Sequence, residues 1–265
     1  MIFQMKESVY FGKKLFRKRF KKYLDNFYKE LSEYISDPNE ENIHDIRTSI
    51  RRLEAVYRIA PKNIRKIKQI KNYVNLAKKL FKFNAKIRDL DITCKKFETR
   101  YPNNTKSLVL NLKNSRVELI QKANKLALEI YRENIPKIPK LDLKGSKLKK
   151  RYDEVLDEVE FQIQKNTIIV LEDEGKLEEL HMLRKDFKKL RYSIELISKE
   201  SPGIKKLKNF QDALGEIHDC DIIIDCLKRL GQDPNYNEII EAENLERGKK
   251  YQEFVTLLKS KDAKS

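Results

Sequence analysis

Two short segments of the chain repeat one arrangement of basic and apolar residues. The first runs from His44 to Leu53 and the second from His181 to Leu190, and both have the pattern His-x-x-Arg-x-x-x-(Arg/Lys)-(Arg/Lys)-Leu. Arginine offers phosphate oxygens a planar fork of donors, and lysine offers them a movable point charge. The repeated pattern therefore indicates anion-binding chemistry.

Helical spacing would place the basic residues of each segment on one face. A helix turns about 100° per residue, which separates the basic side chains of both segments from the apolar ones. The basic faces consist of His44, Arg47, Arg51 and Arg58 in the first copy, and of His181, Arg184, Lys188 and Arg191 in the second. A single charged helix face is usually only solvated surface. Two such faces at matching phase favour a ligand-binding role.

The two segments resemble the CHAD family, the conserved histidine α-helical domain, and the resemblance continues elsewhere. Ile87-Arg-Asp-Leu-Asp-Ile and Leu214-Gly-Glu-Ile-His-Asp-Cys-Asp-Ile are similar to the family's (Arg/His)-Asp-x-Asp signature. Lys188-Lys-Leu-Arg-Tyr-Ser-Ile-Glu and Leu207-Lys-Asn-Phe-Gln-Asp-Ala-Leu-Gly match the family closely. The likeness covers nearly the whole chain. It implies an all-α fold of two pseudo-symmetric four-helix bundles whose basic faces bind inorganic polyphosphate.

Composition agrees with a helical protein that binds polyanions. Charged residues make up 37% of the 265 residues, and the formal net charge is +17; ordinary domains have roughly 25% charged residues. Such a charge predicts partners like polyphosphate, nucleic acid or an anionic membrane surface. No apolar run is long enough to span a bilayer, the N-terminus lacks a signal-peptide core, and the three cysteines fit a reducing compartment. We therefore expect a cytoplasmic protein without a membrane partner, and association with polyphosphate granules would follow from polyphosphate binding.

Apolar periodicity and the positions of proline and glycine divide the chain into eight helices. The predicted helices span residues 5–36, 41–59, 62–97, 105–132, 146–170, 177–198, 202–229 and 236–259. Residues 133–146, with two prolines and a glycine, read as a linker between a first half, 1–132, and a second half, 147–265. Together the halves would form one CHAD domain.

The basic stripes define the predicted binding site. The predicted polyphosphate-binding residues are Lys14, Arg17, Lys21, His44, Arg47, Arg51, Arg52, Arg58, Lys78, Lys82, Arg88, Arg151, His181, Arg184, Lys185, Lys188, Arg191, Tyr192 and Lys208. Tyr192 is the only aromatic residue that we expect within a basic stripe. Nucleic-acid sites normally expose aromatics for base stacking, so this scarcity favours polyphosphate.

The two aspartates of each Asp-x-Asp point in different directions on a helix. Asp89 and Asp219 fall on the basic face, whereas Asp91 and Asp221 fall among apolar residues. An unpaired buried charge is too costly to persist. We therefore expect Asp91 and Asp221 to be structural carboxylates that bond an arginine, a tyrosine or backbone amides of a neighbouring helix.

The sequence offers little support for metal binding or catalysis. Carboxylates two residues apart point about 200° away from each other on a helix, so an Asp-x-Asp cannot share an ion there. Glu172-Asp-Glu-Gly-Lys176 matches the ExExK string of the CYTH triphosphatases, but that string belongs on a strand of a β-barrel, and no segment here alternates like one. We expect no cofactor, no metal and no enzymatic activity. A polyphosphate- or triphosphate-processing enzyme and a nucleic-acid-binding protein remain the alternatives.

Overall fold

The computed structural model describes residues 11–139, 144–198, 202–231 and 234–259. These residues form eight long helices and one short one, and no strand lies within them. The helices are α1 Lys13–Ser36, α2 Glu40–Ile59, α3 Lys62–Arg65, α4 Lys68–Arg100, α5 Lys106–Arg132, α6 Gly145–Glu172, α7 Leu177–Ile194, α8 Pro202–Leu230 and α9 Pro234–Lys259. The all-α prediction is confirmed.

Local chemistry accounts for both ends of α2. Asn39 caps α2, since its side chain accepts a hydrogen bond of 2.8 Å from the backbone N–H of Asn42. Pro61 follows α2 because its ring cannot continue a helix. Residue 5, the predicted start of the first helix, lies outside the described residues, but Phe11 and Gly12 are described and are not helical, so α1 begins at Lys13. Helix α6 begins at Gly145, inside the predicted linker.

Two further differences are an interruption of one predicted helix and the shortening of another by four residues. The helix expected over 62–97 is interrupted between α3 and α4, where Ile67 has an extended backbone and the Tyr57 hydroxyl donates to the Arg65 carbonyl at 3.0 Å. The helix expected to reach residue 198 ends at Ile194. The residue after it, Glu195, turns inward and is only 7% exposed. Tertiary contacts set both boundaries.

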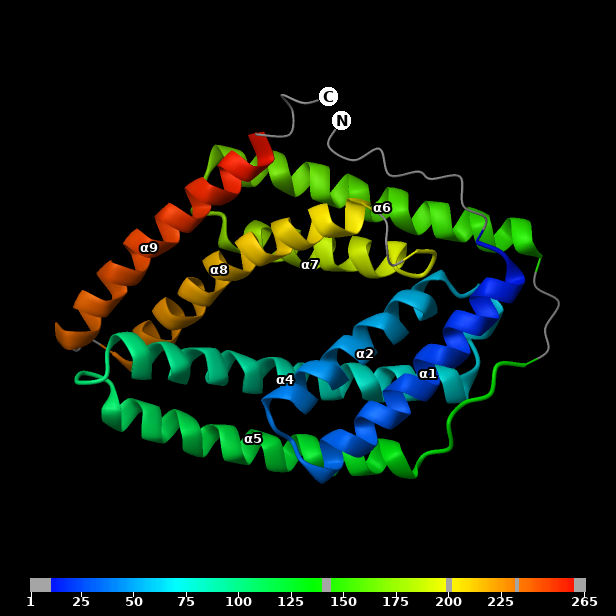
Figure 1. Cartoon of the computed structure of the whole chain (residues 1–265), viewed down its shortest axis with the longest axis horizontal. Helices are drawn as coiled ribbons and strands as arrows, with labels where there is room; N and C mark the ends of the chain where they lie inside the picture. The colour runs from blue at the N-terminus through cyan, green and yellow to red at the C-terminus, as the bar shows by residue number, and fades with distance from the viewer. Residues whose placement is uncertain (1–10, 140–143, 199–201, 232–233, 260–265) are drawn as a thin grey trace.

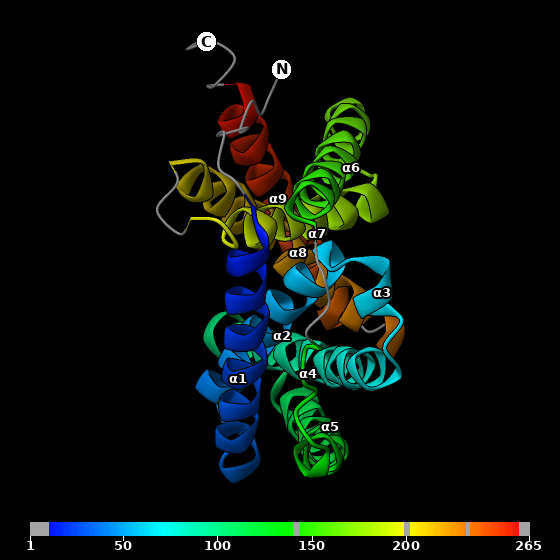
Figure 2. The same cartoon turned by 90° about the vertical axis from the view of Figure 1, so that its right-hand side faces the viewer.

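Each half places its helices side by side (Figures 1 and 2). In the first half α2 packs on α1 and α4, and α5 packs on α4 and α1; in the second half α6, α7, α8 and α9 pack in chain order. The halves meet where α2 contacts α6 and α7, and again where α4 contacts α8. Figure 1 shows α6 and α5 along opposite edges of the molecule. The predicted domain limits stay a prediction.

One main apolar core crosses from one half to the other. It includes Phe20 and Ile50 of the first half and Phe187 and Phe210 of the second, all fully buried. A smaller cluster joins α4 and α5 to α8 and α9 through Phe97 and residues such as Ile223. Full burial of such a side chain contributes about 1.5–3 kcal/mol. The core therefore fixes the helices whose polar faces meet between the halves. No described helix is both long and apolar enough to traverse a bilayer.

Candidate anion-binding site

Basic side chains of the two halves come together where α2 packs on α7. Helix α2 supplies Arg47 and Arg51, and helix α7 supplies Arg184 and Lys188; all four are partly buried. The members of each pair are four residues apart, so they share one helix face. We call Arg47, Arg51, Arg184 and Lys188 the central basic cluster.

The central basic cluster is electrostatically uncompensated. Burial, followed by the charges of Arg184, Arg51 and Arg47, lowers the pKa of Lys188 to about 6. Burial and then Arg51 lower the pKa of Arg47 to about 10. Within the described ranges, none of the four cations forms an ion pair with a carboxylate. An anion placed among them would relieve this repulsion.

One donor of the cluster is buried without a partner. The Nε atom of Arg184 is inaccessible to solvent and makes no hydrogen bond. Buried donors are nearly always paired, and an unpaired one costs about 1–3 kcal/mol. The orphaned guanidinium nitrogen is the kind of group that a bound phosphate oxygen would satisfy.

Helix α4 orients the two arginines of α2. Arg47 donates through Nη1 to the backbone carbonyl of Asn84 at 2.6 Å. The guanidinium carbons of Arg47 and Arg51 lie 5.2 and 5.0 Å from the centre of the Phe81 ring. A cation over an aromatic face is attracted by about 0.5–2 kcal/mol, depending on desolvation. Phe81 thus holds both guanidinium groups on one surface.

Two carboxylates lie within the field of the cluster. Burial raises the pKa of Asp89, and the charges of Arg47, Arg184 and Lys188 oppose that shift. Burial likewise raises the pKa of Asp219, chiefly opposed by Arg184. Both residues lie on the basic side of their helices, where the sequence predicted them. Two carboxylates do not neutralise the three arginines of the cluster, so the cluster keeps a net positive charge whether or not Lys188 is protonated.

A pair of histidines borders the cluster. The rings of His181 on α7 and His218 on α8 are 4.9 Å apart between centroids. Burial and nearby cations, led by Lys185 for His181 and Arg184 for His218, lower their pKa values to about 4 and about 3. Both are therefore neutral at pH 7 and can serve as hydrogen-bonding groups without adding charge. His44 is exposed at the start of α2, outside this pair.

Several predicted site residues already have anionic partners. The Glu195 carboxylate accepts a hydrogen bond from Arg52 Nε at 3.4 Å, and Arg191 Nε lies 3.4 Å from the other oxygen of the same carboxylate. Arg151 pairs with two glutamates of its own helix at 3.2 and 3.3 Å. Burial lowers the pKa of Arg58, and Glu54, Asp186 and Glu158 oppose this shift, so Arg58 lies among carboxylates. Arg88 pairs with Glu40. These cations are less available to a ligand than the central basic cluster.

The remaining predicted residues are dispersed. The exposed ones are Lys14 and Lys21 on α1, Lys82 on α4, Lys185 on α7 and Lys208 on α8. Arg17 donates to the carbonyl of Pro139 at 3.5 Å, and Lys78 lies 5.9 Å from the Tyr57 ring centre. Tyr192 is only 4% exposed. The structure thus brings together one part of the predicted set and spreads the rest over the surface.

The inner aspartates have matching partners in the two halves. Arg116 of α5 donates through Nε to Asp91 at 2.5 Å, and Arg247 of α9 donates through Nε to Asp221 at 2.6 Å. Arg247 also donates to the carbonyl of Glu174 at 2.8 Å. An arginine on a neighbouring helix is the kind of partner that the sequence predicted. Its contribution to stability stays a prediction.

The sequence analysis missed Phe81, Glu195 and the inward position of His218. The view that Tyr192 is the only aromatic in a basic stripe is wrong, because Phe81 lies beneath two arginines of the cluster. Its position between Lys78 and Lys82 on one helix face was an available signal. Glu195 gave no signal, since its role depends on the tertiary turn after α7.

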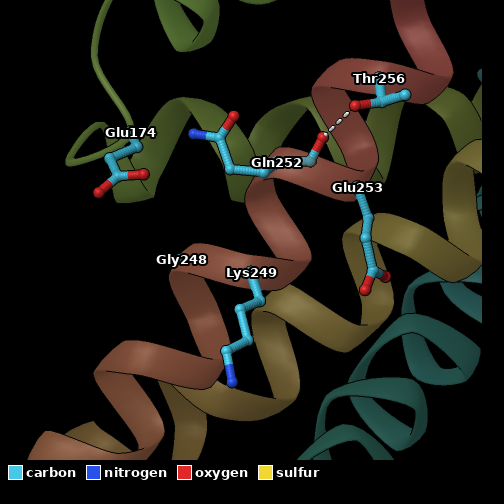
Figure 3. A pocket seen from close by; sticks show the side chains of 6 residues that line it. All are labelled: Glu174, Gly248, Lys249, Gln252, Glu253 and Thr256. Atoms are coloured by element: carbon cyan, nitrogen blue, oxygen red, sulfur yellow. Dashed lines mark hydrogen bonds between the residues drawn. The ribbon is translucent and has the colours of Figure 1, made fainter.

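An open pocket of about 790 Å³ lies elsewhere, between the turn after α6 and one face of α9 (Figure 3). It is lined by Glu174, Gly248, Lys249, Gln252, Glu253 and Thr256, and Thr256 Oγ1 donates to the backbone carbonyl of Gln252 at 2.9 Å. One lysine against two glutamates gives this pocket no cationic character. In the described part of the chain, no three metal-binding side chains of His, Cys, Asp or Glu converge on one point.

Comparisons with known proteins bear on the fold. A family model described as CHAD domain matches residues 18–228. The crystal structure of the CHAD domain from the plant Ricinus communis is similar with a TM-score of 0.58 and 16% sequence identity, over 92% of this chain and 90% of that one. No curated protein matches the chain.

Proposed function

The chain belongs to the CHAD domain family, and from that premise we propose that it binds inorganic polyphosphate between its two halves without chemically changing it. The observation that carries the proposal is the central basic cluster, four partly buried basic side chains on α2 and α7 that pair with no carboxylate in the described part of the chain. The orphaned Arg184 Nε supports it further. A chain of phosphates would supply the missing negative charge to both halves at once.

The surroundings of the cluster favour polyphosphate over nucleic acid. Polyphosphate has no bases, so its recognition rests on charge and hydrogen bonds alone. Single-stranded nucleic acid usually adds base stacking on accessible aromatic rings. Here Phe81 is covered by two guanidinium groups and Tyr192 is buried. We therefore place nucleic acid second among the candidate ligands.

A binding role is also favoured over an enzymatic one. The ExExK-like string lies at the end of α6 and in the turn that follows, where Glu174 lines the open pocket of α9. The string is therefore not on the strand that the triphosphatase motif requires. We further propose that the protein acts in the cytoplasm, where association with polyphosphate granules would follow from this binding.

A competition titration tests the proposed ligand. Long-chain polyphosphate labelled with a fluorophore is bound to the protein at fixed salt, and unlabelled polyphosphate or RNA is added at equal phosphate concentration. We expect polyphosphate to displace the label at a concentration at least about tenfold lower than RNA requires. Equal or stronger displacement by RNA would contradict the proposal.

A second measurement separates binding from catalysis. The protein is incubated with polyphosphate of defined length and magnesium, and the chain length is followed by gel electrophoresis. We expect the length to stay constant. Shortening or growth that is lost on substitution of the central basic cluster would show an enzyme instead.

A further inference from the structure

Lys188 differs from the other cations of the cluster in its capacity to lose charge. It lies one turn after Arg184 on α7, on the face that packs against α2 and α8. An arginine stays protonated at neutral pH, whereas a lysine releases its proton when burial and nearby cations disfavour the charge. Repulsion within the cluster is therefore relieved most readily at Lys188.

The groups around Lys188 are mostly cationic. Arg184 and Arg191 face it from α7, and Arg51 and Arg47 face it from α2. Asp89 of α4 is the carboxylate whose field reaches it, and His218 of α8 is neutral at pH 7. No described carboxylate forms an ion pair with Lys188. The adjacent Lys189, in contrast, pairs with the buried Asp186 at 2.5 Å.

These surroundings decide the charge of Lys188 before a ligand arrives. Burial is the main cause of its low pKa, about 6, and the four arginines add to the effect. Lys188 lies one turn from Arg184 where α7 packs on α2, and no described carboxylate pairs with it, so at pH 7.5 the free protein favours the uncharged amine. A phosphate chain brings negative charges into the same space and favours the ammonium form.

We propose that Lys188 is an uncharged amine in the free protein and accepts one proton from solvent when a phosphate chain binds, so that binding is coupled to proton uptake. The inference rests on the proposed function, because the chain is the source of the negative charge. Histidines 181 and 218 contribute little at this pH, since their pKa values of about 4 and about 3 would have to rise by several units.

The direction of the pH effect follows from linkage. The bound state holds more protons than the free state, so affinity must rise as pH falls. Between the free pKa near 6 and the higher pKa of the bound state, affinity should fall by up to about tenfold per pH unit. Below about pH 6 the dependence should level off, because Lys188 is then protonated before binding.

Calorimetric titration with long-chain polyphosphate in buffers of different ionisation enthalpy measures the protons taken up. Internal phosphates of a long chain stay ionised near pH 7.5, so the ligand itself adds little. We expect uptake of roughly one proton per bound site in the wild-type protein. Lys188→Arg should bind without uptake, because its guanidinium is already charged. Lys188→Gln, which has no titrating group, should bind more weakly and also without uptake.

Lys189→Gln is the matched control, and it should leave the uptake unchanged. Heats that do not vary with buffer in the wild-type protein would overturn the proton uptake while leaving the proposed function in place. Uptake that persists in Lys188→Arg and Lys188→Gln would place the proton elsewhere and overturn the assignment. Absence of binding in every buffer would instead overturn the proposed function, and the inference with it.

Discussion

The two halves of the chain meet in two places that treat charge in opposite ways. Between α2 and α7 the basic side chains of the central basic cluster form no ion pair with any described carboxylate. Between α4 and α9, Glu243 is fully buried and accepts hydrogen bonds from Lys96 Nζ at 2.6 Å and from the Tyr101 hydroxyl at 3.0 Å. Arg100 lies 3.7 Å from the same carboxylate. The buried charge at Glu243 is compensated by its own neighbours, whereas the cluster has more positive than negative charge around it.

From this difference we infer that the Glu243 contact stabilises the fold and that the central basic cluster is the proposed ligand site. A buried carboxylate persists only when cations and hydrogen bonds compensate its desolvation, as they do for Glu243. Uncompensated buried cations lower the stability of the fold, and the packing of the surrounding core offsets this cost. We therefore expect substitutions at the two contacts to separate binding from stability.

The largest effect on binding should follow removal of the central basic cluster. The variant combines Arg47→Gln, Arg51→Gln, Arg184→Gln and Lys188→Met. With six to eight ionic contacts, affinity for a flexible polyanion falls by roughly two to four decades between about 50 and 200 mM salt. We expect the variant to lose at least about a hundredfold in polyphosphate affinity and to flatten this salt dependence. Its melting temperature should not fall, because the substitutions remove repulsion.

A charge-matched control uses exposed cations of α5. Lys106→Gln, Lys122→Gln, Lys125→Gln and Arg132→Gln remove four exposed cations, which is at least as much positive charge as the cluster variant loses. Calorimetric titrations at several salt concentrations should show a change of less than about threefold at low salt. Equal weakening in both variants would mean that net charge, and not the cluster, determines binding.

The second contact should show the reverse behaviour. Glu243→Ala leaves Lys96 and Arg100 without their buried partner, and breaking a buried ion pair costs about 3–5 kcal/mol. Denaturant unfolding should show this loss, while polyphosphate affinity under native conditions should change by less than about twofold. Glu246→Ala is the control, because Glu246 lies 3.9 Å from Arg100 but is partly exposed and should cost less than about 1 kcal/mol. A marked loss of polyphosphate affinity in Glu243→Ala would mean that the Glu243 contact also contributes to binding.

The sequence predicted much of this arrangement because helical phase is a local property. The spacing of Arg47, Arg51, Arg184 and Lys188 already placed each pair on one face, and the helices differ from the predicted ones by a few residues at most described ends. The sequence could not show which cations would be neutralised. Arg52 and Arg191 have the same residue type and similar spacing as the cluster, yet both meet Glu195. That contact depends on the turn after α7 and on the packing of α2 against α7. Neither of these can be predicted from the spacing of residues along a helix.

The two aspartates of each Asp-x-Asp, on α4 and on α8, allow effects on stability and on binding to be compared within one helix. Asp91→Asn and Asp221→Asn each weaken a charged hydrogen bond to an arginine of the next helix, which contributes about 1.5–3 kcal/mol. We expect that loss in denaturant unfolding, with little change in polyphosphate affinity. Asp89→Asn and Asp219→Asn remove negative charge beside the cluster, so they should tighten binding several-fold and change stability by less than about 1 kcal/mol. The opposite pattern would mean that Asp89 and Asp219, and not Asp91 and Asp221, hold the helices together.

The smallest effect should come from the ring beneath Arg47 and Arg51. Phe81→Leu keeps an apolar side chain against the core but removes the aromatic face, on which the two cations depend for about 0.5–2 kcal/mol each. The guanidinium groups then have more freedom, so we expect polyphosphate affinity to fall by roughly threefold to tenfold. The slope of affinity against salt should stay the same, because the number of ionic contacts does not change. This slope separates a positioning role from the loss of a cation.

Two further variants at the same helix complete the test. Phe81→Tyr retains the ring and should restore most of the affinity. Phe83→Leu is the matched control, since Phe83 is also half-buried against the core and neither Arg47 nor Arg51 lies over its ring. If Phe83→Leu weakened binding as much as Phe81→Leu, the effect would come from helix packing. If both left binding unchanged, hydrogen bonds such as the one from Arg47 to the Asn84 carbonyl would suffice to orient the arginines. At the Glu243 contact, by comparison, the carboxylate itself holds Lys96 and Arg100 in place.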